Sequence, residues 1–133
     1  MRVVMLAAVA VVISRAALAQ MADQERRDFA VLDRHAKETA MLSYVAMGAR
    51  ECGFRSAAWL DSIRWAMVRN SGRVATAVPD AMPGGAPAVR AYLTAASATA
   101  EFLATAEAEH RRVSFCSLIR SGATLRYLDT LVP

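Results

Sequence analysis

The chain has 133 residues, of which 56% are hydrophobic, and a formal net charge of +4. This length suits one domain with a modest core and argues against two domains. The basic residues are fifteen arginines and the single lysine Lys37, set among many alanines, a bias typical of a GC-rich bacterial genome. Because no run of Lys or Arg could follow a phosphate backbone, we expect no nucleic-acid partner.

The first nineteen residues have the three parts of a secretory signal peptide. Met1 and Arg2 form a short basic start, residues 3–13 are apolar, and residues 17–19 (Ala-Leu-Ala) place small side chains before Gln20. We therefore predict a leader over residues 1–19 that is cleaved to give a periplasmic or secreted protein. The apolar run is shorter than the roughly 20 residues that span a bilayer, so we expect no stable membrane insertion after cleavage.

The mature chain, residues 20–133, is predicted to be a single all-α domain, a small bundle of about four helices. Residues 23–52 contain no proline, one glycine and many strong helix formers, which indicates one long helix. Its uncharged second half, residues 39–49, is expected at the centre of the core. Apolar residues in its first half recur at helical spacing: Phe29, Leu32, Ala36 and Ala40.

A second helix is expected to follow a short turn. Gly53 suits a left-handed terminating position, and Ser56 suits the N-cap of a helix that reaches Arg69 or Asn70. Residues 70–87 then hold three of the four prolines and three of the six glycines. We predict a long loop there, interpreted first as a tether across the end of the bundle and alternatively as a functional segment.

Two further helical segments are predicted after the loop. Residues 88–108 form an Ala-rich helix whose small side chains allow close approach of a neighbour, with a stripe of apolar residues on one face: Val89, Leu93, Ala96, Ala100 and Leu103. Residues 113–131 form a last helix broken near Gly122, although residues 112–119 alone would also fit a strand.

Cys52 and Cys116 are the only cysteines, and both remain after cleavage of the leader. In an exported chain a sole pair is expected to form a disulfide. The two cysteines are 64 residues apart. A disulfide that closes a loop of this length adds roughly 4 kcal/mol to the stability of the fold in the chain-entropy model. A redox-active pair is the alternative, but it usually has the two cysteines close in sequence.

Each of the two histidines has a glutamate one helical turn away: His35 with Glu38, and His110 with Glu107. Glu107 and His110 have the Glu-x-x-His spacing that di-metal helical bundles use on two of their helices, and this chain contains that spacing once. The alternative function is therefore a metal- or haem-binding bundle that uses these two residues. Both pairs lie in charged stretches, which favours a solvated face and no metal. We therefore expect no cofactor.

Three methionines could serve as axial ligands of a non-covalently bound haem: Met41, Met47 and Met67. Methionines at helical spacing more often fill a hydrophobic core.

No nucleophile motif, paired acids on one helix face or glycine-rich phosphate loop occurs, so we expect no enzyme and no catalytic residues. What remains is recognition by a surface. Trp65 falls among the polar residues of the second helix beside Arg64 and Arg69, a grouping common at interface hot spots. We expect the Trp65 ring to be covered by the Pro-rich loop or a neighbouring helix, and the alternative is an exposed interaction surface.

The sequence thus predicts an exported, non-catalytic helical protein that acts as an interaction or stress-related binding module on an unknown envelope protein. Its size and single cysteine pair are similar to those of small helical periplasmic proteins, acid-stress chaperones among them, although no motif of that group is matched.

Overall fold

The computed structural model describes the backbone of residues 2–132 and the side chains of Gln20 and residues 22–132. These residues form helices and no strand, which confirms the predicted all-α bundle. The predicted leader, residues 1–19, lies outside the part whose side chains are described. The elements in chain order are α1 (Arg2–Glu51), α2 (Ala57–Ala77), the 3₁₀ helix η1 (Pro79–Ala81), α3 (Ala86–His110), α4 (Arg112–Ser121) and α5 (Ala123–Asp129).

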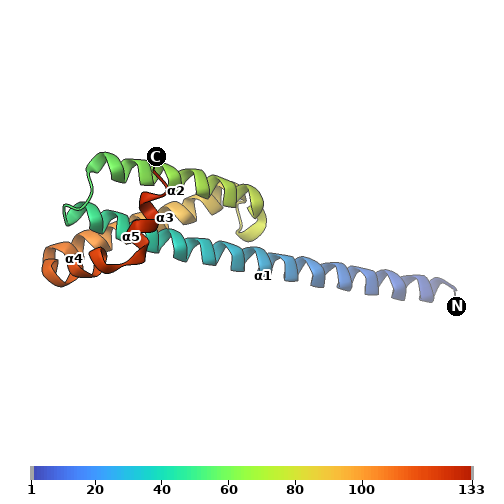
Figure 1. Ribbon diagram of the computed structural model, residues 1–133. Helices are drawn as coiled ribbons and strands as arrows, with labels where there is room; N and C mark the ends of the chain where they lie inside the picture. Colours follow the sequence, from blue (N-terminus) through green and yellow to red (C-terminus); the bar gives the residue numbers. More distant parts are fainter. Residues whose placement is uncertain (1, 133) are drawn as a thin grey trace.

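The long helix α1 organises the molecule, and its first half projects away from the other helices (Figure 1). Among the described side chains of α1, Leu32 is the first that is fully buried. α1 packs most extensively on α3, and α2 lies against both of them. The shorter helices α4 and α5 also pack on α1, and the end of the chain returns beside α2, where Leu131 and Val132 pack on the core.

The core consists of three clusters, of which the second and third share the partly buried residues Val45, Met47 and Trp59. The first joins α1, α2, η1 and α3 around Leu32, Val78 and Leu93. The second lies near the disulfide around Phe115, and the third joins α1, α2 and α5 around Ile63. The uncharged second half of α1 runs between these clusters. As predicted, most of residues 39–49 are buried or partly buried, although the Met41 side chain remains 52% exposed.

The residues that the sequence predicts at the end of the first long helix and at the start of the second have these roles in the structure. Gly53 has a φ of 73° in the turn after α1, and the Ser56 hydroxyl accepts a hydrogen bond from the Trp59 backbone N–H at 3.1 Å. Pro87 lies in the first turn of α3. The last segment divides at Gly122 into α4 and α5, so residues 112–119 are helical and the strand alternative is wrong.

The predicted loop over residues 70–87 is too long, because α2 continues as a helix to Ala77. Residues 74, 75 and 78 are buried in the first core cluster, and this burial outweighs the weak helix propensity around Gly72. The prolines begin only at Pro79, and η1 then packs on α1 with Ala81 buried. The connection between α2 and α3 is therefore residues 78–85, which is shorter than predicted and packs on α1.

Near the C-terminal end of α3, the residues that are buried differ from those predicted. Leu103 is 51% exposed, whereas the neighbouring Ala104 and Ala108 are buried against Ala49 of α1. Small residues on both helices permit this close approach, and a leucine at the contact would hold the helices apart. Phe29, expected on the stripe of α1, is likewise 50% exposed, because it precedes the packed part of that helix.

Within the described residues, no helix is long and apolar enough to cross a membrane.

Candidate functional site

The two cysteines form the predicted disulfide, with a Cα–Cα distance of 5.6 Å between Cys52 and Cys116. This distance is typical of disulfides in folded proteins. The bond joins the turn after α1 to α4, and both cysteines pack on the core cluster around Phe115. Close by, the Arg112 guanidinium donates a hydrogen bond of 2.6 Å to the backbone carbonyl of Glu51, an acceptor at the end of α1. Both contacts hold α4 on α1.

Trp65 is the most exposed aromatic residue of α2, with 65% of its surface accessible, and the nearby Val68 is 57% exposed. The expectation that a loop or helix covers Trp65 is therefore wrong. The reason is the length of α2: the Pro-rich segment starts beyond Ala77 and packs on α1 instead of folding back over the outer side of α2.

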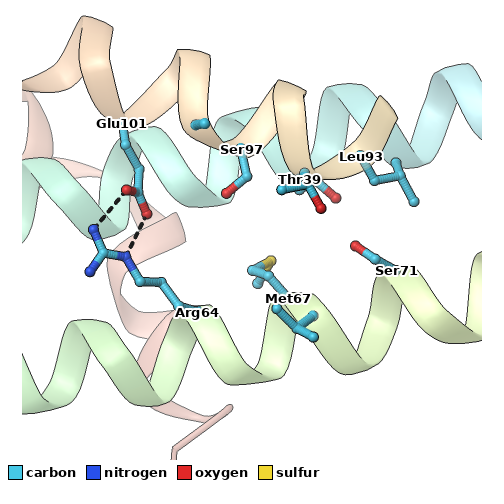
Figure 2. Close-up of a pocket in the computed structure, with 10 residues that line it drawn as sticks. Thr39, Arg64, Met67, Ser71, Leu93, Ser97 and Glu101 are labelled. Carbon is cyan, nitrogen blue, oxygen red and sulfur yellow. Dashed lines mark hydrogen bonds and ion pairs between the residues drawn. The ribbon is translucent and has the colours of Figure 1, made fainter. Parts of the chain in front are cut away.

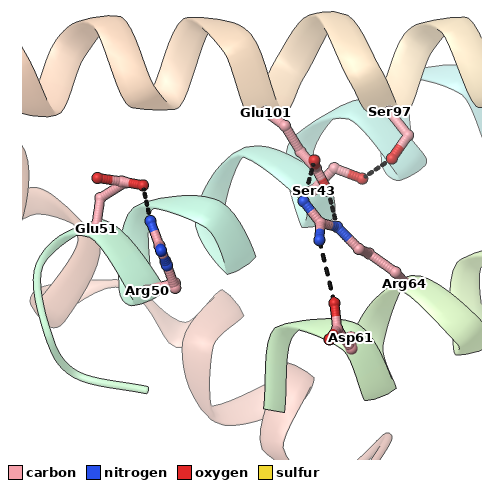
Figure 3. Close-up of polar contacts among 7 residues, drawn as sticks. All are labelled: Ser43, Arg50, Glu51, Asp61, Arg64, Ser97 and Glu101. Atoms are coloured by element: carbon pink, nitrogen blue, oxygen red, sulfur yellow. Dashed lines mark hydrogen bonds and ion pairs between the residues drawn. The ribbon is translucent and has the colours of Figure 1, made fainter. Parts of the chain in front are cut away.

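Arg64, predicted to act with Trp65, is engaged within the fold (Figure 3). Its Nε and Nη2 donate hydrogen bonds of 2.9 and 2.8 Å to the two carboxylate oxygens of Glu101 on α3, and Nη1 donates one of 3.1 Å to Asp61. The hydrogen bond with Glu101 raises the pKa of Arg64 above the ordinary arginine value. Arg64 thus links α2 to α3, and the exposed residues Trp65, Val68 and Arg69 remain as what we call the α2 outer face.

A cavity of about 240 Å³ lies between α2 and α3, with the Arg64–Glu101 pair at one end (Figure 2). Thr39 of α1 and Ser97 of α3 supply polar groups along it. The Ser97 hydroxyl forms a 2.7 Å hydrogen bond with Ser43 of α1 (Figure 3). The charged groups of this cavity, Arg64 and Glu101, already bind one another. The cavity therefore has no free charged group with which to bind a charged ligand.

The two histidine–glutamate pairs have different surroundings. His110 is exposed, and Glu107 accepts a 2.8 Å hydrogen bond from Nε of Arg111, so the fold does not build a shared site from this pair. His35, by contrast, is only 28% exposed, and its Nδ1 lies 3.6 Å from the Glu38 carboxylate. The solvated face expected for His35 is wrong, because α2 lies over this side of α1. Among the described side chains, no group of three or more His, Cys, Asp or Glu residues could hold a metal ion.

The fold also brings together polar residues that sequence reasoning missed. His35 of α1, Arg69 and Arg73 of α2, and Tyr127 of α5 line a second cavity between these three helices. They come from three separate segments, so no local spacing marks them as a group. No known protein family, curated protein or solved structure matches this chain.

Proposed function

We propose that the protein is exported by the leader over residues 1–19, matures at Gln20, and acts in the bacterial envelope as a non-catalytic binding module. The disulfide between Cys52 and Cys116 supports a non-reducing compartment. The contact surface in this proposal is the α2 outer face, and the partner is a protein of the envelope.

The exposed Trp65 side chain is the observation that carries the proposal. Tryptophan is frequent among the residues that dominate binding energy at interfaces, and arginine often accompanies it. Val68 and Arg69 lie three and four residues further along α2, so all three side chains share one face of the helix. Arg69 makes no ion pair with another described side chain, which leaves its charge free for an acidic group on the partner.

Site-specific photocrosslinking in the periplasm tests this proposal. A photoreactive phenylalanine analogue at position 65 should give a discrete adduct with one envelope protein. The same analogue at Val113, which is 89% exposed on α4, is the matched control for an apolar residue elsewhere on the surface.

Excess purified protein should suppress the adduct, whereas the Trp65→Ala variant should suppress it far less. Identical adducts from positions 65 and 113, or equal competition by the Trp65→Ala variant, would count against the α2 outer face.

A further inference from the structure

The second cavity lies between α1, α2 and α5 and has a volume of about 340 Å³. Its polar residues include His35 on α1, the adjacent Arg69 and Asn70 on α2, and Arg73 one turn further along α2. Glu38 of α1 is its only acidic side chain. The cavity therefore carries two arginine charges against one carboxylate, a net charge of +1 from these three groups.

The hydrogen-bonding capacity of these polar groups is largely unused. Among the described residues, His35 Nδ1 is the only buried side-chain nitrogen or oxygen without a hydrogen bond, and the Glu38 carboxylate, 3.6 Å away, is its nearest charged neighbour. Arg69 and Arg73 make no ion pair there either, whereas Arg64 and Arg55 each bind a carboxylate through two nitrogens. Arg69 and Arg73 are exposed to solvent, so their guanidinium groups are free to bind an anionic group that enters the cavity beside His35.

The opposite side of the cavity is apolar. Leu42 of α1, Met67 of α2 and Leu131 after α5 line it, together with the ring of Tyr127. An adjoining cavity of about 420 Å³ shares Glu38, Leu42 and Tyr127 and adds the exposed Met41 side chain. Together the two cavities form a groove with the arginines of α2 in one cavity, Glu38 where the two cavities meet, and mainly apolar side chains toward α5.

We propose that this groove binds an amphiphilic small molecule with a single carboxylate head and an apolar body. The planar guanidinium groups of Arg69 and Arg73 match the geometry of a carboxylate, and the apolar body lies along Leu42 and Tyr127. The net charge of +1 favours a monoanion over a phosphate dianion. This site is distinct from the α2 outer face, apart from Arg69, which borders both, and it goes beyond the protein–protein contact proposed above.

Isothermal titration calorimetry with sodium decanoate tests the proposal on the mature protein. We expect saturable binding of decanoate, and at least tenfold weaker binding of 1-decanol, which has the same tail without the charge, and of acetate, which has the head alone. Arg73→Gln should weaken decanoate binding by about tenfold, the effect of losing one charge-assisted hydrogen bond. Arg126→Gln, an exposed arginine outside both cavities, should leave the affinity unchanged.

The two histidines provide a second, internal comparison by NMR. Decanoate should shift the ring resonances of His35 and leave those of His110 in place, because His110 is exposed at the far end of α3. Failure of decanoate to bind, equal affinity for decanol, an Arg73→Gln variant of unchanged affinity, or a His35 resonance that does not move would each overturn the proposal. These outcomes leave crosslinking at Trp65 unaffected, so the two proposals fail separately.

Discussion

Gly48 and Gly72 both lie inside helices, but their surroundings are opposite. A Cβ atom built on Gly48 of α1 would lie 2.8 Å from side-chain atoms of Phe115 and Ile119 on α4, which shows how closely these helices approach. A Cβ on Gly72 of α2 would meet nothing within 4 Å. The same substitution should therefore change stability in opposite directions at the two positions.

Gly48→Ala should lower the free energy of unfolding by about 1–3 kcal/mol, because Phe115 and Ile119 must shift in a packed core. Gly72→Ala should raise it by about 0.5–1 kcal/mol, since alanine is the better helix former at an unobstructed position. Urea denaturation of the two variants measures both changes. A Gly48→Ala variant as stable as the unmodified protein would show that α1 and α4 pack less closely than described.

Single residues also mark where sequence reasoning succeeds and where it fails. Gly53 and Ser56 were identified correctly because turn and cap geometry depends on neighbouring backbone atoms. Leu103 was placed in the core, whereas the buried residue is Ala104, because the distance between α1 and α3 decides which side chain fits. That distance depends on Ala49, far away in the sequence.

Among the helices, α4 depends most on a covalent link. It has ten residues, and it packs through Phe115 and Ile119 while the disulfide joins it to the turn after α1. Cys52→Ser and Cys116→Ser should lower the melting temperature similarly, and the double variant should be no worse than either single one, because each removes the same bond. Differential scanning calorimetry measures this. Two free thiols in unfolded, unreduced protein would contradict the pairing.

Arg55, in the turn before α2, holds α5 in place through Asp129. Its Nε and Nη2 donate hydrogen bonds to the two oxygens of the Asp129 carboxylate, with 2.9 Å between Nε and Oδ1. The hydrogen bond from Arg55 lowers the pKa of Asp129 from its ordinary value of 3.8. A carboxylate with a lowered pKa adds stability above its unfolded pKa and loses it as the pH falls through the folded value.

A double-mutant cycle of Arg55→Gln and Asp129→Asn should therefore give a coupling energy at pH 7 that declines as the pH falls through the lowered pKa of Asp129. Both side chains are about one-third exposed, so solvent screening keeps the coupling below about 1 kcal/mol. A coupling that stays unchanged after Asp129 has been protonated would mean that the two residues interact by contact rather than by charge.

The extent of α2 shows why helix ends are harder to predict than helices. The prolines and glycines of residues 70–87 predict an end near Asn70, yet the helix runs on to Ala77. Val74 and Ala75 gain enough burial against α1 and α3 to extend it. This extension in turn leaves Trp65 exposed, so the error in the helix end and the error in the surroundings of Trp65 have one cause.

At the level of the whole molecule, the helical class and the disulfide followed from the sequence, because helix propensity is local and two cysteines allow one pairing. The groove between α1, α2 and α5 did not. It depends on the chain returning after α5, so that Tyr127 and Leu131 lie opposite His35 and Arg73. Such a convergence of distant segments leaves no periodic pattern in the chain.

We propose that this bundle works outside the reducing cytoplasm after loss of residues 1–19. Intact-mass analysis of protein from the periplasmic fraction of the expressing cell, without reductant, tests it directly. The account predicts a chain that begins at Gln20 and is lighter by two hydrogen atoms than the reduced form, as the Cys52–Cys116 bond requires. A cytoplasmic chain that retains Met1 and carries two free thiols would contradict it.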